Sequence, residues 1–146
     1  MKTFISFLMA IAVISSIAGN PFKGSEAVVK SEFIYLKQDV QFPSCHASTI
    51  VETPEGMIAA WFGGTEERAP DVCIYVSINK NGKWSKPEMA ADGIHEGKQY
   101  PCWNPVLFRK DNGDVVLYYK VGPTPRDWWG LYKTSKDNGK TQRFRE

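Results

Sequence analysis

The sequence predicts an all-β chain that contains about two blades of a β-propeller. One observation is a meander pattern, in which short runs of Val, Ile and aromatic residues alternate with tight turns that contain Gly, Pro or Asn. The other is a repeat with an offset of 57 positions, seen in three pairs of landmarks: Gly56 and Gly113, Trp61 and Tyr118, and Gly82 and Gly139. A period near 50 residues is typical of propeller blades, and two unrelated hairpins of a β-sandwich are the alternative.

The start of the chain predicts export. Residues 1–18 have a cationic Lys2, an apolar run over Phe4–Ile14 that is short for a membrane span, and small residues before the expected cleavage point. A secreted or periplasmic protein is therefore expected, without membrane contact after cleavage; a short membrane anchor is the alternative. Residues 19–42 form a lead-in, in which Glu32–Leu36 is a candidate strand.

The first blade is expected over about residues 43–90. Pro54 presets φ in its first turn and Gly56 tolerates positive φ there. In chain order its expected parts are a strand at Ile50–Val51, a turn at Thr53–Gly56, a strand at Met57–Phe62, a strand at Val72–Ser77, a polar turn at Asn79–Gly82 and an extended pair at Lys83–Trp84.

The second blade is expected over about residues 100–146, after a polar linker at 92–100. Its expected strands and turns, in order, are Pro105–Phe108, Asp111–Gly113, Val115–Tyr119, Gly130–Thr134 and Asp137–Gly139. The loop at Gly122–Gly130 holds two Pro, two Trp and Arg126, a composition that favours binding on a rigid β scaffold, although the Trp pair could instead plug a propeller channel.

Composition narrows the function. The formal net charge of +2 gives no reason to expect a nucleic-acid partner. Aromatic residues make up 13% of the chain, which suits sugar stacking and suits a packed β core equally well. No cofactor is expected, and no His or Cys spacing indicates a metal site.

The three cysteines are an odd number, so they cannot all pair within the chain. Cys73 is expected in the core, and a disulfide between Cys45 and Cys102 is one possibility.

A turn motif connects the chain with a known family. Ser135–Thr141 fits Ser-x-Asp-x-Gly-x-Thr and resembles the Asp box of sialidases and other BNR-repeat propellers, with Gln142 where Trp is usual. Ser77–Trp84 looks like a degenerate first copy that keeps the Ser, Gly and Trp and loses the Asp. In such a turn the Asp carboxylate accepts backbone N–H groups and the Gly takes positive φ, so the motif supports the fold and not the reaction.

The resemblance extends upstream. Cys45–Thr65 resembles the first blade of an exo-sialidase, and residues 63–71 and 101–105 resemble sialidase-like BNR proteins of bacteria and plants. The implied fold is a six-bladed sialidase-like β-propeller, of which this chain holds about two blades over 43–146. A truncated gene product is therefore expected, and a small domain that closes a ring by oligomerisation is the alternative.

The resemblance also implies a site. The family's acid/base Asp falls on Asp71, and its first substrate-binding Arg falls on His46, which could bind an acidic sugar or act as a base. Glu66 and Glu67 lie in the same Gly-rich loop and are further candidate acids. For Glu66 and Glu67 the structural alternative is a solvated loop charge. For Asp71 it is a turn cap, and for His46 it is a rim histidine with satisfied hydrogen bonds.

Substrate binding is assigned to residues at the predicted channel end of both blades. Guanidinium groups match a sugar carboxylate and aromatic faces match a pyranose ring. The candidates are Arg68, Trp103, Asn104, Lys120, Arg126 and Trp128, with Trp129 beside it. The family's later arginines, its Tyr nucleophile and the partner Glu have no counterpart in this chain.

The leading functional hypothesis is an exported exo-α-sialidase-like glycoside hydrolase that cleaves a terminal acidic sugar from glycans. A propeller lyase or a rhamnosidase-type enzyme acting on uronic-acid glycans is the second hypothesis, with His46 as the base of the lyase. A non-catalytic glycan-binding propeller is the third. Fold likeness alone does not decide among them.

Overall fold

The computed structural model describes residues 30–137 and 139–145. Its contacts divide the chain into two units, Met1–Glu32 and Phe33–Glu146. In the described part of the first unit, Lys30 Nζ lies 2.8 Å from the Glu32 carboxylate. The predicted signal peptide, residues 1–18, falls outside the described residues. No helix in the described part is both long enough and apolar enough to span a membrane.

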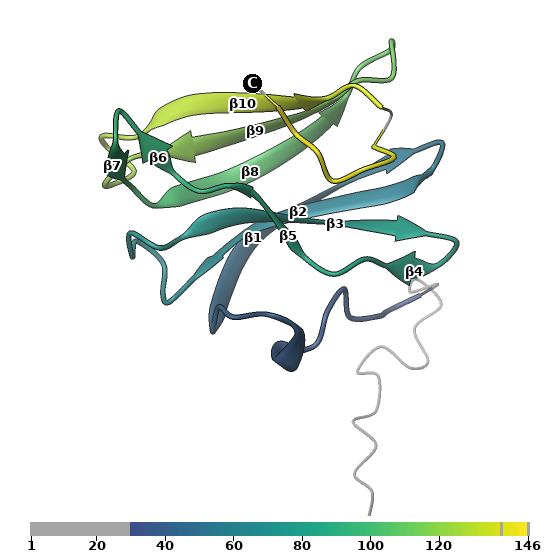
Figure 1. The fold of residues 1–146 in the computed structure, drawn as a ribbon, viewed down its shortest axis with the longest axis horizontal. Coiled ribbons are helices and arrows are strands. Elements are labelled where there is room, and N and C mark those ends of the chain that lie inside the picture. Colours follow the sequence, from purple (N-terminus) through teal and green to yellow (C-terminus); the bar gives the residue numbers. More distant parts are fainter. Residues whose placement is uncertain (1–29, 138, 146) are drawn as a thin grey trace, which may run out of the picture. The chain divides into compact units, whose positions relative to one another are not determined.

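The first sheet of the second unit is an antiparallel meander (Figure 1). It begins after a short 3-10 helix, η1 (Lys37–Asp39). Its strands are β1 (Ser44–Thr53), β2 (Gly56–Gly64), β3 (Cys73–Lys80), β4 (Lys83–Trp84) and β5 (Glu88–Ala91), and both β4 and β5 pair with β3.

Turn chemistry explains the register of this sheet. Thr53 Oγ1 accepts a hydrogen bond from Glu55 N (3.2 Å) and donates one to Gly56 O (3.0 Å). Gly56 has φ of 133°, and a Cβ there would run into the carbonyl of Asn79. Only glycine fits this position, so the turn and the β2–β3 pairing are fixed together.

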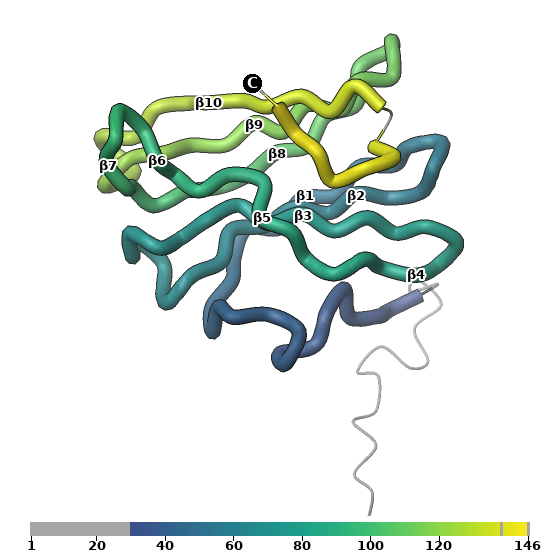
Figure 2. Tube along the Cα trace, viewed as in Figure 1, coloured from purple at the N-terminus to yellow at the C-terminus, as the bar shows by residue number. Residues whose placement is uncertain are grey.

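The second sheet consists of β8 (Cys102–Arg109), β9 (Val115–Val121) and β10 (Trp129–Ser135), again antiparallel. After β10 the chain turns back toward it (Figure 2), and Thr134 and Arg145 exchange two backbone hydrogen bonds of 2.6 and 3.0 Å. The tail thus starts to add a fourth strand, as β4 and β5 do in the first sheet.

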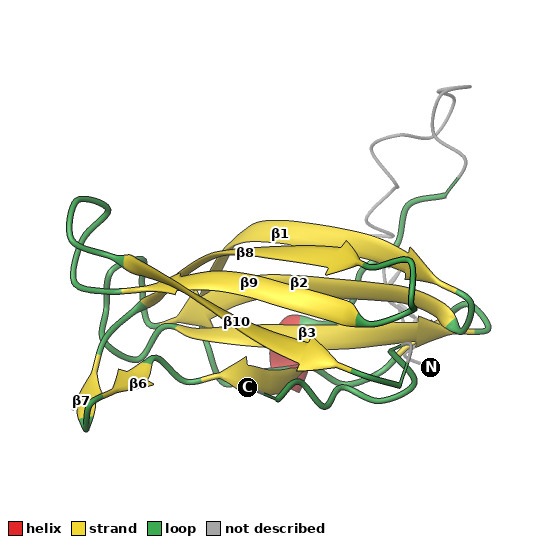
Figure 3. Ribbon diagram, turned by 90° about the horizontal axis from the view of Figure 1, so that it is seen from above, coloured by secondary structure: helices red, strands yellow, loops and turns green. Residues whose placement is uncertain are grey.

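The two sheets pack face to face and share one core. Figure 3 shows β8, β9 and β10 lying over the first sheet. Alternate residues of each strand point inward, as the two-residue period of a strand requires. The core includes Ile58, Phe62, Ile74, Val76, Leu107, Val115, Leu117 and Val121, all at most 7% exposed. The prediction of an all-β chain with antiparallel, blade-like sheets is confirmed; the described residues form two such sheets and no closed ring.

The lead-in differs from its prediction. Glu32–Leu36 is not a strand; within the second unit, irregular chain from Phe33 onward packs on the outer face of the first sheet instead. The ring of Tyr35 stacks on Trp61 with centroids 5.1 Å apart, and Phe42 packs on Tyr75 at 4.4 Å. Aromatic packing, and not a hydrogen-bonded ladder, holds this segment, so its apolar composition misled the strand prediction.

Two further expectations need correction. The predicted polar linker at 92–100 contains a small hairpin, β6 (Ile94–His95) and β7 (Lys98–Gln99). The suggested Cys45–Cys102 disulfide is absent, because all three cysteines are free thiols. Cys45 is exposed, whereas Cys102 is fully buried in the shared core.

Candidate functional site

The loops that carry the predicted site residues lie at one end of both sheets (left in Figure 1), which we call the rim. Here β1 and β8 begin, the loop at 65–72 joins β2 to β3, and the loop at 122–128 joins β9 to β10. The Cys102 N–H donates to Val72 O at 2.9 Å, so the first loop is held against the start of β8. Residues from two repeats are thereby brought to one edge of the molecule.

A β-bulge interrupts the start of the first strand of each sheet, β1 in the first and β8 in the second. The register shifts between His46 and Thr49 in β1, and between Trp103 and Val106 in β8. Within the bulges Ala47 has φ of 53° and Asn104 has φ of 30°, at positions 57 apart. Bulges re-aim side chains and are common beside active sites. Left-handed backbone is unusual for a non-glycine residue, and Ala47 in particular carries strain that the surrounding sheet must hold.

Asp71 anchors the first rim loop. Its Oδ2 accepts hydrogen bonds from Thr65 N (2.9 Å) and from Thr65 Oγ1 (2.6 Å). Among the described residues none donates to Oδ1, and the residue is exposed. The side chain thus caps its loop through one oxygen, as the structural alternative predicts, and leaves the other oxygen available at the surface.

His46 and Glu67 form the ionisable pair of the rim. His46 Nδ1 lies 3.6 Å from Glu67 Oε2, and their side chains are 73% and 51% exposed. The imidazole also meets the ring of Phe62 edge-on, with centroids 5.7 Å apart. Contact with Phe62 and Glu67 orients the imidazole, while its exposure leaves it open to a ligand.

An aromatic group with a cation marks the second repeat. Trp103 is 2% exposed, and its Nε1 donates to Gly122 O at 2.8 Å. Trp128 packs on it edge-on at 5.5 Å, and Lys120 Nζ lies 5.0 Å from the centre of the Trp128 ring. With almost no surface of its own, Trp103 positions Trp128, which is only partly buried.

Four other predicted residues lie on the rim with exposed side chains: Glu66, Arg68, Asn104 and Arg126. In the described part of the chain, no hydrogen bond or ion pair joins the side chain of Arg68 or of Arg126 to another rim residue. Arg68 has φ of 79°, in the left-handed region. Among the described residues no cluster of His, Cys, Asp and Glu could hold a metal ion.

Sequence reasoning missed the supports of the rim. Thr65 gives Asp71 both of its hydrogen bonds, and Gln99 Nε2 donates to Pro70 O at 3.0 Å and also to Asp92 O. A Thr shortly after Gly63-Gly64 that precedes an Asp by six positions is a usable signal, since hydroxyl groups often close such loops. The contact of Gln99 has no signal in the sequence.

The Asp-box motif forms the expected turn at the end of β10. Asp137 accepts hydrogen bonds from Ser135 Oγ (2.7 Å), Thr141 Oγ1 (2.6 Å) and Thr141 N (3.2 Å). Burial raises the pKa of the Asp137 carboxyl group. These hydrogen bonds and one from the backbone of Lys140 lower it by more, so the pKa of Asp137 is held below its usual value. Gly139 takes φ of 74°.

The first copy of the turn uses other chemistry. Asn81 and Gly82 both have positive φ (54° and 77°), the pairing that a tight hairpin turn favours. Ser77 Oγ donates to Ser85 O at 2.8 Å, and Ile78 N donates to Ser85 Oγ at 3.0 Å. Hydroxyl groups thus replace the missing carboxylate.

The repeated meanders, the paired bulges and the Asp-box turn fit a repeat protein of the sialidase-like or glycan-related propeller class. A sequence profile of the BNR repeat-like domain matches residues 55–146, and the chain belongs to this family. The resemblance inferred from the Asp box is thereby confirmed. No significant match is found among curated proteins.

Proposed function

We propose that this chain carries part of the active site of an exported glycoside hydrolase that removes a terminal acidic sugar from glycans. The observation that carries the proposal is the rim itself, where the loops and strand ends that hold Asp71 and the His46–Glu67 pair lie at the same end as those that hold Lys120, Arg126 and Trp128. A carboxyl group, several cations and an aromatic face are what such a substrate requires.

Asp71 is the proposed acid/base residue. Thr65 occupies Oδ2 with two donated hydrogen bonds, so a proton on this carboxyl group belongs on Oδ1, the oxygen without a donor. From Oδ1 the proton passes to the glycosidic oxygen as its bond to the anomeric carbon breaks, and the carboxylate then takes a proton from the water whose oxygen bonds to that carbon. Thr65 is therefore a positioning residue that selects the reactive oxygen.

The acidic group of the sugar binds to the cationic side chains of the rim. Arg126 and Arg68 have exposed guanidinium groups, whose forks match a carboxylate in a bidentate way. Lys120, held over Trp128, adds a point charge beside a surface on which a sugar ring can stack. His46 contributes a further donor, with Glu67 orienting its ring and Glu66 nearby in the same loop.

The test is hydrolysis of a fluorogenic sialoside by the whole product of the gene. Asp71→Asn should lower turnover by about 10²–10⁴-fold, the usual contribution of general acid–base catalysis, with the thermal midpoint kept. Asp111→Asn is the matched control, because Asp111 is an exposed turn carboxylate away from the rim, and it should leave turnover unchanged. Equal rates for wild type and Asp71→Asn would remove Asp71 from the catalytic role.

A second candidate is a lyase acting on uronic-acid glycans, supported by the His46–Glu67 pair at 3.6 Å. A neutral imidazole next to a carboxylate is a suitable base for abstracting the proton beside a uronate carboxyl group. A lyase forms an unsaturated product that absorbs in the near ultraviolet, and His46→Ala should abolish that signal. A rhamnosidase-type enzyme would release rhamnose instead, and binding without turnover would identify a glycan-binding propeller.

A further inference from the structure

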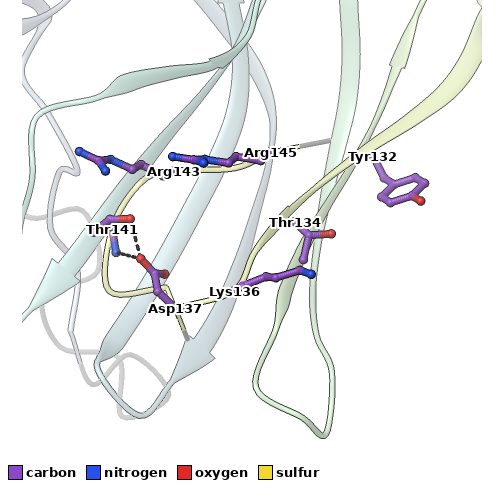
Figure 4. A pocket seen from close by; sticks show the side chains of 7 residues that line it. All are labelled: Tyr132, Thr134, Lys136, Asp137, Thr141, Arg143 and Arg145. Carbon is purple, nitrogen blue, oxygen red and sulfur yellow. Dashed lines mark hydrogen bonds between the residues drawn. The ribbon is translucent and has the colours of Figure 1, made fainter.

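A basic groove lies at the other end of the second sheet, beside the Asp-box turn (Figure 4). It lies between β10 and the returning tail and has a volume of about 720 Å³. We call it the tail groove; its lining residues are Tyr132, Thr134, Lys136, Asp137, Thr141, Arg143 and Arg145. None of them belongs to the proposed rim site.

The backbone that carries the two arginines is fixed. Gln142 Nε2 donates to Val76 O (2.8 Å) and to Lys86 O (3.0 Å) of the first sheet. Phe144 is buried in the core shared by the two sheets, at 8% exposure, and Arg145 pairs through its backbone with Thr134. Because side chains alternate along an extended segment, burying Phe144 sends Arg143 and Arg145 to the opposite face.

The cations of the groove outnumber its acidic residue and form no ion pair with it. Among the described residues, none of Lys136, Arg143 and Arg145 forms an ion pair. Asp137 is the acidic residue in the lining, but Ser135 and Thr141 already occupy both of its oxygens. Figure 4 shows Arg143 and Arg145 in a row, with both side chains pointing away from Tyr132. Cations on one surface repel each other, and the oxyanions of a bound chain offset that repulsion.

The positive surface continues past the tail. A second hollow of about 550 Å³ shares Arg143 and Thr141 with the tail groove and adds Lys80, Lys83 and Lys140. Lys140 is paired with Glu55 at 3.6 Å, and Glu88 also lines this hollow, but cations remain in excess. A surface of this kind fits a chain of several negative groups better than it fits one ion.

The other end of the tail groove is aromatic. Tyr132 is 61% exposed, and Thr134 lies between it and the two arginines (Figure 4). A tyrosine ring offers an apolar face on which a pyranose ring can stack, and the Thr hydroxyl can hydrogen-bond to the sugar. We propose that the tail groove binds an acidic glycan chain, with Arg143 and Arg145 each binding a sulfate or carboxylate group and Tyr132 stacking on another sugar of the same chain. This site is independent of the rim and does not depend on the proposed hydrolase activity.

Calorimetric titration with a heparin-derived tetrasaccharide tests the proposal. Wild-type protein should bind it, and Arg143→Ala/Arg145→Ala should weaken binding by about tenfold or more, because charge-assisted forks are lost. Lys37→Ala/Lys110→Ala is the matched control: it removes the same charge from two exposed lysines outside the groove and should bind like wild type. Circular dichroism confirms that each variant is folded.

Three further comparisons sharpen the test. Arg143→Lys/Arg145→Lys keeps the charge and loses the forks, so it should bind more weakly than wild type. Completely desulfated tetrasaccharide separates the sources of the oxyanion, since retained affinity assigns the arginines to carboxylates and lost affinity to sulfates. Equal weakening in the arginine variant and in the lysine control would overturn the proposal, because binding would then reflect general charge. Inorganic sulfate binding as tightly as the tetrasaccharide would also overturn it, by reducing the groove to a site for single ions.

Discussion

Equivalent positions in the two repeats have opposite surroundings. Cys45 and Cys102 stand 57 positions apart at the starts of β1 and β8, yet Cys45 is exposed and Cys102 is fully buried. The outer faces differ in the reverse sense, since Trp61 in β2 is 3% exposed and its counterpart Tyr118 in β9 is 45% exposed. Burial here is set by what covers each sheet and not by the position within the repeat.

The covering segments can be identified. The start of β8 lies under the end of the 65–72 loop and under Gly93, where an added Cβ would come within 3.2 Å of Cys102 Sγ. On the outer faces, the lead-in places Tyr35 on Trp61, whereas Tyr118 has the ring of Tyr132 beside it at 6.1 Å. A repeat sequence therefore has to be interpreted together with its neighbours.

The largest expected effect is in thiol reactivity. Burial, and then the charges of Asp92 and Asp71, raise the pKa of Cys73 to about 11; burial likewise raises that of Cys102 to about 12. At pH 8 a thiol reagent should modify Cys45 about 100-fold faster than either buried thiol, since the thiolate is the reactive form. Counting three thiols after denaturation completes the measurement, and a count of one would restore the disulfide between Cys45 and Cys102.

The second largest effect is a difference in the free energy of unfolding between truncations on the two outer faces. Trp61→Ala removes a ring packed between the first sheet and the lead-in and should lower the free energy of unfolding by about 3–5 kcal/mol. Tyr118→Ala truncates a half-exposed ring and should cost less than about 1 kcal/mol. Chemical denaturation measures both, and equal losses would show that the outer face of the second sheet is covered in solution.

The turns that follow β3 and β10 should differ in how their contribution to the free energy of unfolding depends on pH. Asp137→Asn should lower the free energy of unfolding by about 1–2 kcal/mol at neutral pH through lost hydrogen bonds. Because the folded pKa of Asp137 lies below 3.8, this stabilisation is complete above that value and is lost as pH falls through the folded pKa. Ser85→Ala in the first turn should cost about 0.5–1.5 kcal/mol at every pH. Parallel pH profiles for the two variants would contradict the assignment to the carboxylate.

The smallest effect concerns the bulges. Ala47→Gly relieves a left-handed alanine and should raise the free energy of unfolding by about 0.5–1 kcal/mol. Asn104→Gly should be nearly neutral, because asparagine tolerates this region. Denaturation midpoints of the two variants decide the matter; a loss of stability in Ala47→Gly would mean that the alanine is not strained in solution.

The sequence was sufficient for the features that depend on neighbours along the chain. Gly56, the Asn81-Gly82 pair and the motif around Asp137 each specify a turn through local chemistry, and the strands follow from the apolar runs between the turns. The grouping of rim residues also follows, since antiparallel strands of a meander return to the same end.

Contacts between distant segments could not be predicted in this way. Tyr35 looks like a strand residue until Trp61 is known to lie beneath it, and Trp103 looks like a binding residue until the carbonyl of Gly122 and the ring of Trp128 are placed against it. The bond from Thr65 to Asp71 is shorter in range, but its partner is one of several acids in the same loop.

The side-chain amide of Gln142 has a consequence for the time course of folding. It satisfies carbonyls of residues that precede it by 66 and 56 positions, Val76 and Lys86. During synthesis these carbonyls can accept hydrogen bonds only from water until Gln142 has left the ribosome. Contacts of such long sequence separation are formed late and slow the overall reaction. The first sheet can therefore assemble while the chain is still growing, but it becomes fully bonded only after nearly all of the second repeat has been made.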